Sequence, residues 1–380
     1  MLLQIFTFSG NALSKPYVNL YLVALGVSAS QLGIILSIGA LLEMAVIPVM
    51  TSAADHRGKH RLLYTGFIGT LAVGNVLLVS SDWFWSLALA AVLIEMAFRP
   101  TASLGFQLVI TQVHNEGRNI AGRIRGISSL GFGLASLVAG PLFALAGYTG
   151  LFLSAVASYL GGLVFRDSLP ESISDPVNSE PETQTPPVPH NRGFYLLMVS
   201  MFFLMMAHRA GYAFWFVHFQ QNLGVSTGEI GRLAALMALV EIPFFVLLDP
   251  LLTRIDVRLA FILGGLGMSA VWLGTGFLPS RGWIYPLLLL RGGVFSAFYL
   301  TTFLVIVQIS APQNVATNQA LLQGTIPSLA TVLTSPLSGW LYDVAGPKAL
   351  YSAITVVSLI GIGIVIAGYH LLKPVPEAAV

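Results

Sequence analysis

Residues 25–49 read LGVSASQLGIILSIGALLEMAVIPV, and residues 223–247 read LGVSTGEIGRLAALMALVEIPFFVL. The two stretches align without a gap, 198 residues apart, and share LGVS, a glycine pair (Gly33 and Gly231) and a glutamate pair (Glu43 and Glu241). Looser matches link QLVITQ at 107–112 with FLVIVQ at 303–308, and AGPL at 139–142 with TSPL at 334–337. The chain is therefore predicted to be an internal duplication.

Composition decides the solvent. Hydrophobic residues make up 56% of the 380 positions and charged residues only 9%, which a water-exposed surface of this size would not tolerate. We expect an all-α membrane protein, because apolar runs near 20 residues recur along the chain. Twelve such runs are predicted, at 2–25, 30–52, 62–80, 83–112, 121–146, 148–165, 194–222, 228–252, 257–278, 283–309, 315–342 and 347–372. The first run lacks a basic segment before it and a cleavage site after it, so we expect it to be retained.

The two copies are expected to form two bundles of six helices. The stretch between them is rich in Pro, Ser and acidic residues and cannot bury a core, which predicts an N-terminal bundle at 1–166, a linker at 167–192 and a C-terminal bundle at 193–380. Lys and Arg gather in the loops after even-numbered spans of the first half, so both termini and the linker are expected in the cytoplasm. Internal repeats joined by a linker are typical of secondary transporters, whose substrate site lies where the repeats meet.

One loop carries a recognisable motif. TSAADHRGKHR at 51–61 is similar to the G-x-x-x-D-x-x-G-[RK]-[RK] signature of the major facilitator superfamily, with Asp55, Gly58 and Lys59 matching and Thr51 replacing the first glycine. Two further segments, at 208–231 and 121–143, resemble the branch that holds phenylpropionate permease-like and nucleoside-proton symporter-like proteins. The resemblance implies that Asp55, Gly58 and Lys59 form a conformational latch at the cytoplasmic face.

The same resemblance implies that spans 1, 4, 7 and 10 line a central cavity. Asn11, Lys15 and Asn19 recur every fourth residue of the first span and would share one face. A charge at bilayer depth normally faces protein or water, so Lys15 is predicted to point into the cavity. Pro16 disfavours helix at the residue before it, which predicts a disturbance there.

The other polar residues of these spans complete the expected site. Glu95 and Arg99 lie one turn apart and are expected to pair, either permanently or with one partner switching during transport. Arg291 lies nearer the end of its span and either joins the site or extends to the interface. Predicted substrate-binding residues are Asn11, Lys15, Tyr17, Asn19, Arg99, Arg209, Tyr212, Trp215, Arg291 and Phe298.

Three intramembrane carboxylates are candidates for carrying a proton, ranked Glu95, Glu241 and Glu43, although the symmetric Glu43 and Glu241 could equally be structural. No catalytic motif, cysteine or ATPase segment is present, and His208 and His218 do not share a helix face, so we expect no enzyme activity, cofactor or metal site.

The sequence thus predicts a proton-coupled transporter of a small organic solute in the inner membrane. The predicted cavity contains more cationic than anionic side chains. This excess slightly favours an aromatic carboxylate over a neutral nucleoside or sugar, with efflux of drug-like solutes as a further alternative. A sensor that transports nothing is a remote alternative on the same fold. The expected partners are the solute, protons and lipid, with the protein as a monomer.

Overall fold

The repeated LGVS stretch ends one helix and starts the next in both copies. In the computed structural model, which describes residues 1–115, 121–173, 191–252, 254–311 and 314–372, Gly26 and Gly224 have φ of 89° and 67°. This left-handed conformation favours glycine and stops a helix. Ser28 then forms a capping box with Gln31, and Ser226 forms the same box with Glu229. The repeat in the sequence is thus a repeat in local structure.

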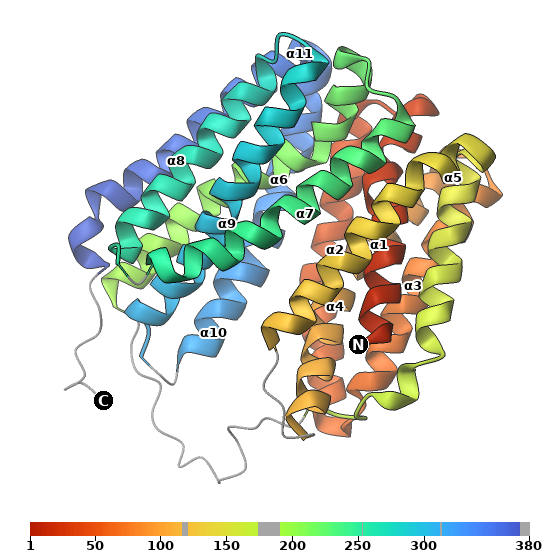
Figure 1. Ribbon diagram of the computed structural model, residues 1–380, viewed down its shortest axis with the longest axis horizontal. Coiled ribbons are helices and arrows are strands. Elements are labelled where there is room, and N and C mark those ends of the chain that lie inside the picture. Colours follow the sequence, from red (N-terminus) through yellow and green to blue (C-terminus); the bar gives the residue numbers. More distant parts are fainter. Residues whose placement is uncertain (116–120, 174–190, 253, 312–313, 373–380) are drawn as a thin grey trace. The chain divides into compact units, whose positions relative to one another are not determined.

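Helices account for nearly all of the described chain (Figure 1). In chain order they are α1 Leu2–Ala24, α2 Ala29–Arg57, α3 His60–Ser80, α4 Phe84–Asn115, α5 Ala121–Leu163, α6 Arg192–Leu223, α7 Thr227–Leu252, α8 Val257–Gly276, α9 Ile284–Ile309, α10 Val315–Ala320 and α11 Ile326–Ala367. A π-helical turn at Leu321–Thr325 joins α10 to α11, and short 3₁₀ turns lie at Arg166–Ser168, Arg281–Trp283 and Tyr369–Leu371.

Two of these helices each contain two spans. Gly147 in α5 has φ 60° and ψ −155°, and Gly346 in α11 has φ 75° and ψ −179°, so the backbone leaves helical geometry at both. With α5 and α11 divided there, and α10 counted as the start of α11, the described residues form the twelve predicted helical segments. Eight helical stretches of this part of the chain are long and apolar enough to cross a membrane.

Pro16 does not interrupt α1, which runs through it from Leu2 to Ala24. The predicted disturbance at Lys15 is therefore not a break in the helix. Proline is tolerated within membrane helices because neighbouring groups satisfy the freed backbone carbonyl. Lys15 is consequently held on a regular helix, with its side chain direction fixed by the helix rather than by a loop.

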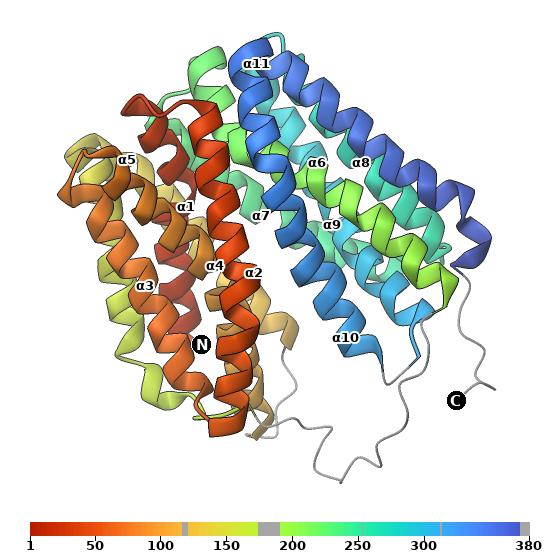
Figure 2. The same cartoon turned by 180° about the vertical axis from the view of Figure 1, so that it is seen from behind.

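The chain divides into two compact units. Unit 1 comprises residues 1–183 with 224–239, and unit 2 comprises residues 184–223 with 240–380. The predicted boundaries at 166 and 192 stay a prediction. In unit 1, α1 packs along α5, and α4 packs against α2 and α3. In unit 2, α6 packs along α11, and α8 packs against α9 and α11, as both views show (Figures 1 and 2).

Each unit buries aromatic side chains and exposes aliphatic ones. Tyr17, Tyr64 and Tyr159 are among the largest fully buried side chains of unit 1, and Trp215 and Trp272 among those of unit 2. Many leucine and valine side chains are exposed instead. An apolar exterior of this kind is what lipid contact requires.

Candidate functional site

Three helices of unit 1 bring four charged side chains together. The ammonium group of Lys15 on α1 contacts Glu95 Oε2 on α4 directly. Glu95 Oε1 lies 3.7 Å from Arg99 Nη2 one turn further along α4. The same Arg99 nitrogen lies 2.9 Å from Glu43 Oε2 on α2. We call these four residues the unit 1 charge cluster; its two cations and two anions balance.

Small and aromatic neighbours shape this cluster. A Cβ atom on Gly39 of α2 would come within 2.6 Å of the Glu95 Cβ, so only glycine allows α2 to approach α4 this closely. The Lys15 ammonium also lies 5.3 Å from the centre of the Phe98 ring, within cation–π range. The Lys15 side chain is 29% exposed, against 10% for Glu95. Lys15 is therefore the more accessible partner of the pair.

The arrangement determines which group is easiest to displace. Glu95 lies between two cations, Lys15 and Arg99. Arg99 is also held by Glu43 across to α2, whereas Lys15 is the more exposed partner. Lys15 is therefore the less constrained of the two cations beside Glu95.

Unit 2 contains a related pair. The guanidinium of Arg291 on α9 contacts the carboxylate of Glu241 on α7. It also lies 4.2 Å from the centre of the Phe295 ring and 5.2 Å from that of Tyr212. The Arg291 side chain is only 5% exposed. Arg291 is thus buried and does not extend toward the membrane surface. This excludes one of the two interpretations that the sequence left open.

The two halves use equivalent charge pairs. Glu43 and Glu241 occupy matching positions of the repeat, and each pairs with an arginine from the fourth helical segment of its own copy, Arg99 or Arg291. The expected pair of Glu95 with Arg99 exists, but at 3.7 Å it is longer than the contact of Arg99 with Glu43. Arg99 therefore lies nearer to Glu43 than to Glu95, and Glu95 lies nearer to Lys15 than to Arg99.

Aromatic rings surround the unit 2 pair. His208 stacks on Phe295 with ring centres 5.7 Å apart and lies 4.6 Å from Tyr212. Tyr212 in turn meets Trp215 at 5.0 Å and Trp272 at 5.3 Å. Arg209 is half-buried on the same helix, α6. These rings form one continuous aromatic cluster beside a buried cation.

Other predicted substrate-binding residues lie in packed surroundings. Asn11 is buried and accepts a hydrogen bond of 2.9 Å from the Tyr159 hydroxyl on α5, so it faces a different helix from Lys15. Tyr17 and Trp215 are fully buried. Phe298 stacks on Phe261 of α8 at 5.4 Å. Asn19 is half-buried on α1. Their role in binding stays a prediction.

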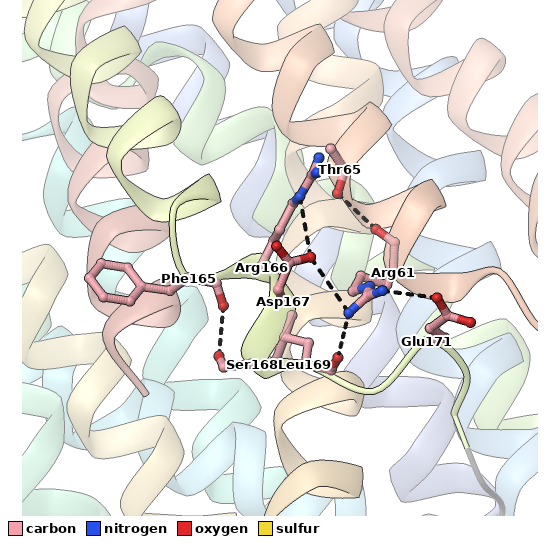
Figure 3. Close-up of polar contacts among 8 residues, drawn as sticks. All are labelled: Arg61, Thr65, Phe165, Arg166, Asp167, Ser168, Leu169 and Glu171. Atoms are coloured by element: carbon pink, nitrogen blue, oxygen red, sulfur yellow. Dashed lines mark hydrogen bonds and ion pairs between the residues drawn. The ribbon is translucent and has the colours of Figure 1, made fainter.

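The loop with the family signature is anchored within unit 1. Gly58 has φ 62°, which allows the tight turn from α2 to α3, and Lys59 directly precedes α3. Arg61 donates to the Leu169 carbonyl at 3.2 Å and to Glu171 at 2.9 Å (Figure 3). These bonds hold the segment after α5 against the turn between α2 and α3. The side chain of Asp55 lies outside the described residues. The latch role of Asp55, Gly58 and Lys59 stays a prediction.

No group of three or more His, Cys, Asp or Glu side chains that could hold a metal ion occurs among the described residues. The charged groups of the site pair with one another instead.

A comparison with known families matches residues 2–353 to the MFS_1 like family of the major facilitator superfamily. The chain belongs to this family. As a major facilitator protein, it is a multi-pass membrane transporter and not an enzyme. The expectation drawn from the α2–α3 loop and the repeat is thereby confirmed at the level of the superfamily.

Individual relatives of this family member are distant. The tetracycline resistance protein, class G, of Vibrio anguillarum is 26% identical over 350 residues, covering 86% of this chain and 81% of that protein. Among solved structures, the nucleoside transporter NupG is 16% identical with a TM-score of 0.73, covering 98% of both chains. A bacterial homologue of the human lysosomal transporter Spinster, inward-facing and occupied, is 15% identical with a TM-score of 0.71, covering 99% of this chain and 97% of its own. These structures share the fold.

Two site residues were missed by the sequence reasoning for this major facilitator protein. Gly39 lies among other glycines of an apolar span, and nothing in the sequence shows that it faces Glu95. Trp272 lies on α8, the ninth span, which the family architecture leaves outside the cavity; a large aromatic residue in the middle of such a span was the available signal. Both depend on packing between helices, which spacing along one helix does not reveal.

Proposed function

We propose that this transporter couples movement of protons to movement of a small organic acid that carries an aromatic ring. The observation that carries the proposal is the position of Glu95 between Lys15 and Arg99. A carboxylate in such a place takes up a proton most easily when one cation leaves, and a cation leaves most easily when another anion attracts it. A carboxylated substrate would supply that anion.

The coupling step follows from this competition. The substrate carboxylate draws the Lys15 ammonium away from Glu95, and Glu95 then accepts a proton. The loaded protein carries one anion and one proton, so the buried charge stays nearly balanced, and the change between inward- and outward-open forms becomes favourable. Protonation of Glu95 or binding of the substrate alone leaves an unbalanced charge, which disfavours the transition.

Arg209 and the aromatic cluster of unit 2 support an aromatic substrate. Beside the paired Arg291 and Glu241, Arg209 adds a second cation to a region rich in rings. A solute that carries an aromatic ring suits such surroundings, because an apolar wall of rings binds it.

Uptake of an acid and of its amide separates the substrate classes. In proteoliposomes with an imposed pH gradient, we expect accumulation of phenylpropionate and none of phenylpropionamide, since the amide cannot displace Lys15. We expect Lys15→Gln to reduce acid uptake about tenfold or more, the effect of losing a charged hydrogen bond. Accumulation of amide and acid at equal rates would contradict an anion site and would favour a neutral solute such as a nucleoside or a sugar.

Efflux of drug-like solutes is a second candidate, favoured by the similarity to a tetracycline resistance protein over most of the chain. On this alternative, cells that express the protein would tolerate tetracycline, and Glu95→Gln would abolish the tolerance. The same cells would show no uptake of aromatic acids.

The remaining parts of the proposal follow the positive-inside pattern and the family resemblance. We propose an inner-membrane protein with both termini in the cytoplasm, working as a monomer. Asp55, Gly58 and Lys59 are proposed as the latch that closes the cytoplasmic side.

A further inference from the structure

A buried histidine that the proposed coupling step does not use lies at the C-terminal end of α6. The His218 ring is 4% exposed. Its Nε2 atom lies 3.1 Å from the main-chain oxygen of Thr275 on α8, and its Nδ1 atom lies 3.1 Å from Asn222 Oδ1 one turn further along α6. The Tyr342 hydroxyl on α11 donates to the same Asn222 oxygen at 2.9 Å. The bonds of His218, Asn222 and Tyr342 thus link α6, α8 and α11. These three helices are neighbours in unit 2 (Figures 1 and 2).

The Thr275 oxygen is well placed to stabilise a cation. Thr275 is the second-last residue of α8, which ends at Gly276, so its carbonyl lies in the last turn, where no further turn provides a backbone donor. The C-terminal end of a helix also carries partial negative charge, which favours a protonated histidine. Because a carbonyl can only accept, Nε2 must carry a hydrogen whether the ring is neutral or charged.

The second ring nitrogen decides the charge. With Asn222 Oδ1 facing the ring, both nitrogens of His218 meet acceptors, and only an imidazolium donates to both. A neutral ring leaves Nδ1 as an acceptor, and the Asn222 amide then has to turn so that its NH₂ group faces the ring. The Tyr342 hydroxyl fits both cases, since it donates to Oδ1 and accepts from NH₂. The network is therefore satisfied with and without the proton.

Other titratable groups around the ring are few among the described residues. Tyr351 of α11 lies beside the ring, with centres 5.5 Å apart, and donates its own hydroxyl to the Gly211 carbonyl. Asp343 and Lys348 lie on the same helix as Tyr342, on either side of the Gly346 kink, and both are exposed, so their opposite charges act from the surface. Asn222 is itself exposed and lies directly against the buried ring. The buried ring is therefore separated from solvent by a single side chain.

We propose that His218 is a second proton-binding site of this transporter, separate from the unit 1 charge cluster. When the ring gains or loses its proton, the Asn222 amide rotates to present its oxygen or its NH₂ group to the ring. The proton strengthens the contact between α6 and α8, because both hydrogen bonds of the ring become charge-assisted. In the predicted orientation this end of α6 faces the outside, so the site responds to external pH. The proposal concerns proton binding alone and does not depend on which solute is carried.

Titration of the ring tests the site. The full-length protein, labelled with ¹⁵N-histidine and held in lipid nanodiscs, contains seven histidines, and loss of one signal in His218→Gln identifies the ring. Between pH 5 and pH 8.5 we expect this signal to pass from a doubly to a singly protonated ring. Asn222→Asp fixes an anionic acceptor beside Nδ1 and should raise the midpoint by about one pH unit or more, a tenfold gain in proton affinity.

A matched control separates the hydrogen bond from general charge. Gln221→Glu adds the same negative charge at the adjacent exposed position, whose side chain is not the partner of either ring nitrogen, and should move the midpoint by less than a third as much. A ring that stays singly protonated over the whole range overturns the proposal, and so does an equal shift in the two variants. Should His218→Gln fail to fold, the signal that moves in Asn222→Asp identifies the ring instead.

Discussion

At the scale of single residues, the proposed coupling depends on the contact of Lys15 with Glu95. The sequence indicated that Lys15 needs a partner in the membrane and that Glu95 lies one turn from Arg99. It did not indicate that Lys15 and Glu95 belong to each other, because they lie on α1 and α4 and only packing sets the distance between those helices. Spacing along one helix predicted the longer contact, that of Glu95 with Arg99.

A double-mutant cycle tests this contact. Lys15→Ala leaves the Glu95 carboxylate with one cation fewer, and we expect transport to fall about tenfold or more while expression is kept. Glu95→Gln should also lower proton-driven transport. Because the two groups act on each other, the loss in activation free energy of the double variant should be smaller than the sum of the two single losses by about 0.5–3 kcal/mol. The rates are measured as initial uptake in proteoliposomes; independent, multiplying losses would show that the two residues do not cooperate.

Asp256 provides a prediction of pH dependence outside the membrane spans. It caps α8 by accepting from the Arg258 main-chain nitrogen at 2.8 Å, and it accepts from the Tyr369 hydroxyl at 2.9 Å. Hydrogen bonds from the Arg258 side chain hold the pKa of Asp256 well below its usual range. A carboxyl whose pKa is lowered by folding stabilises the protein above its unfolded pKa of about 3.9 and loses that contribution as the pH falls further.

Asp256→Ala should therefore cost about 1 kcal/mol at pH 7, the usual loss for a helix cap. The difference between wild type and variant should begin to shrink below about pH 4, where Asp256 of the unfolded chain takes up a proton while the carboxyl of the folded protein is still charged. Thermal unfolding in detergent from pH 3 to pH 8 measures both effects. A difference that grows toward acid pH would contradict the sign of the shift.

At the scale of elements, much of the structure was readable from the chain. Apolar runs gave the twelve spans, and the glycines at 147 and 346 mark the turns that divide α5 and α11. The LGVS repeat gave the equivalence of Gly26 and Gly224 and of the two capping boxes, because these contacts lie within a few residues of one another. The pairing of α2 with α4 through Glu43 and Arg99 was not readable, since it joins residues that are far apart in the sequence.

The two equivalent pairs give a prediction at this scale. Arg99→Gln or Arg291→Gln removes one partner of a largely buried pair and should destabilise the protein by about 3 kcal/mol, because a carboxylate remains without its cation. Adding Glu43→Gln to the first variant, or Glu241→Gln to the second, should restore most of the lost stability. Thermal unfolding midpoints in detergent measure the recovery. Double variants that are less stable than the single ones would show that these residues do not act as pairs.

At the scale of the whole molecule, membership of the major facilitator superfamily was predicted by the internal repeat and the α2–α3 loop and is confirmed by the family match over residues 2–353. The solute is a different kind of property. It depends on a few side chains, which we propose include Lys15 and Arg209, while the fold is shared with a nucleoside transporter and a Spinster homologue at only 16% and 15% identity. Because one fold transports several kinds of solute, the fold alone does not identify the solute of this protein.

The proposed coupling requires that Glu95 carries the proton. Its most direct test compares wild type and Glu95→Gln in proteoliposomes under two conditions, accumulation of phenylpropionate driven by a pH gradient and exchange of labelled for unlabelled phenylpropionate without one. Exchange needs no net proton movement, so we expect Glu95→Gln to lose accumulation and to keep exchange. Accumulation by the variant at the wild-type level would contradict the claim.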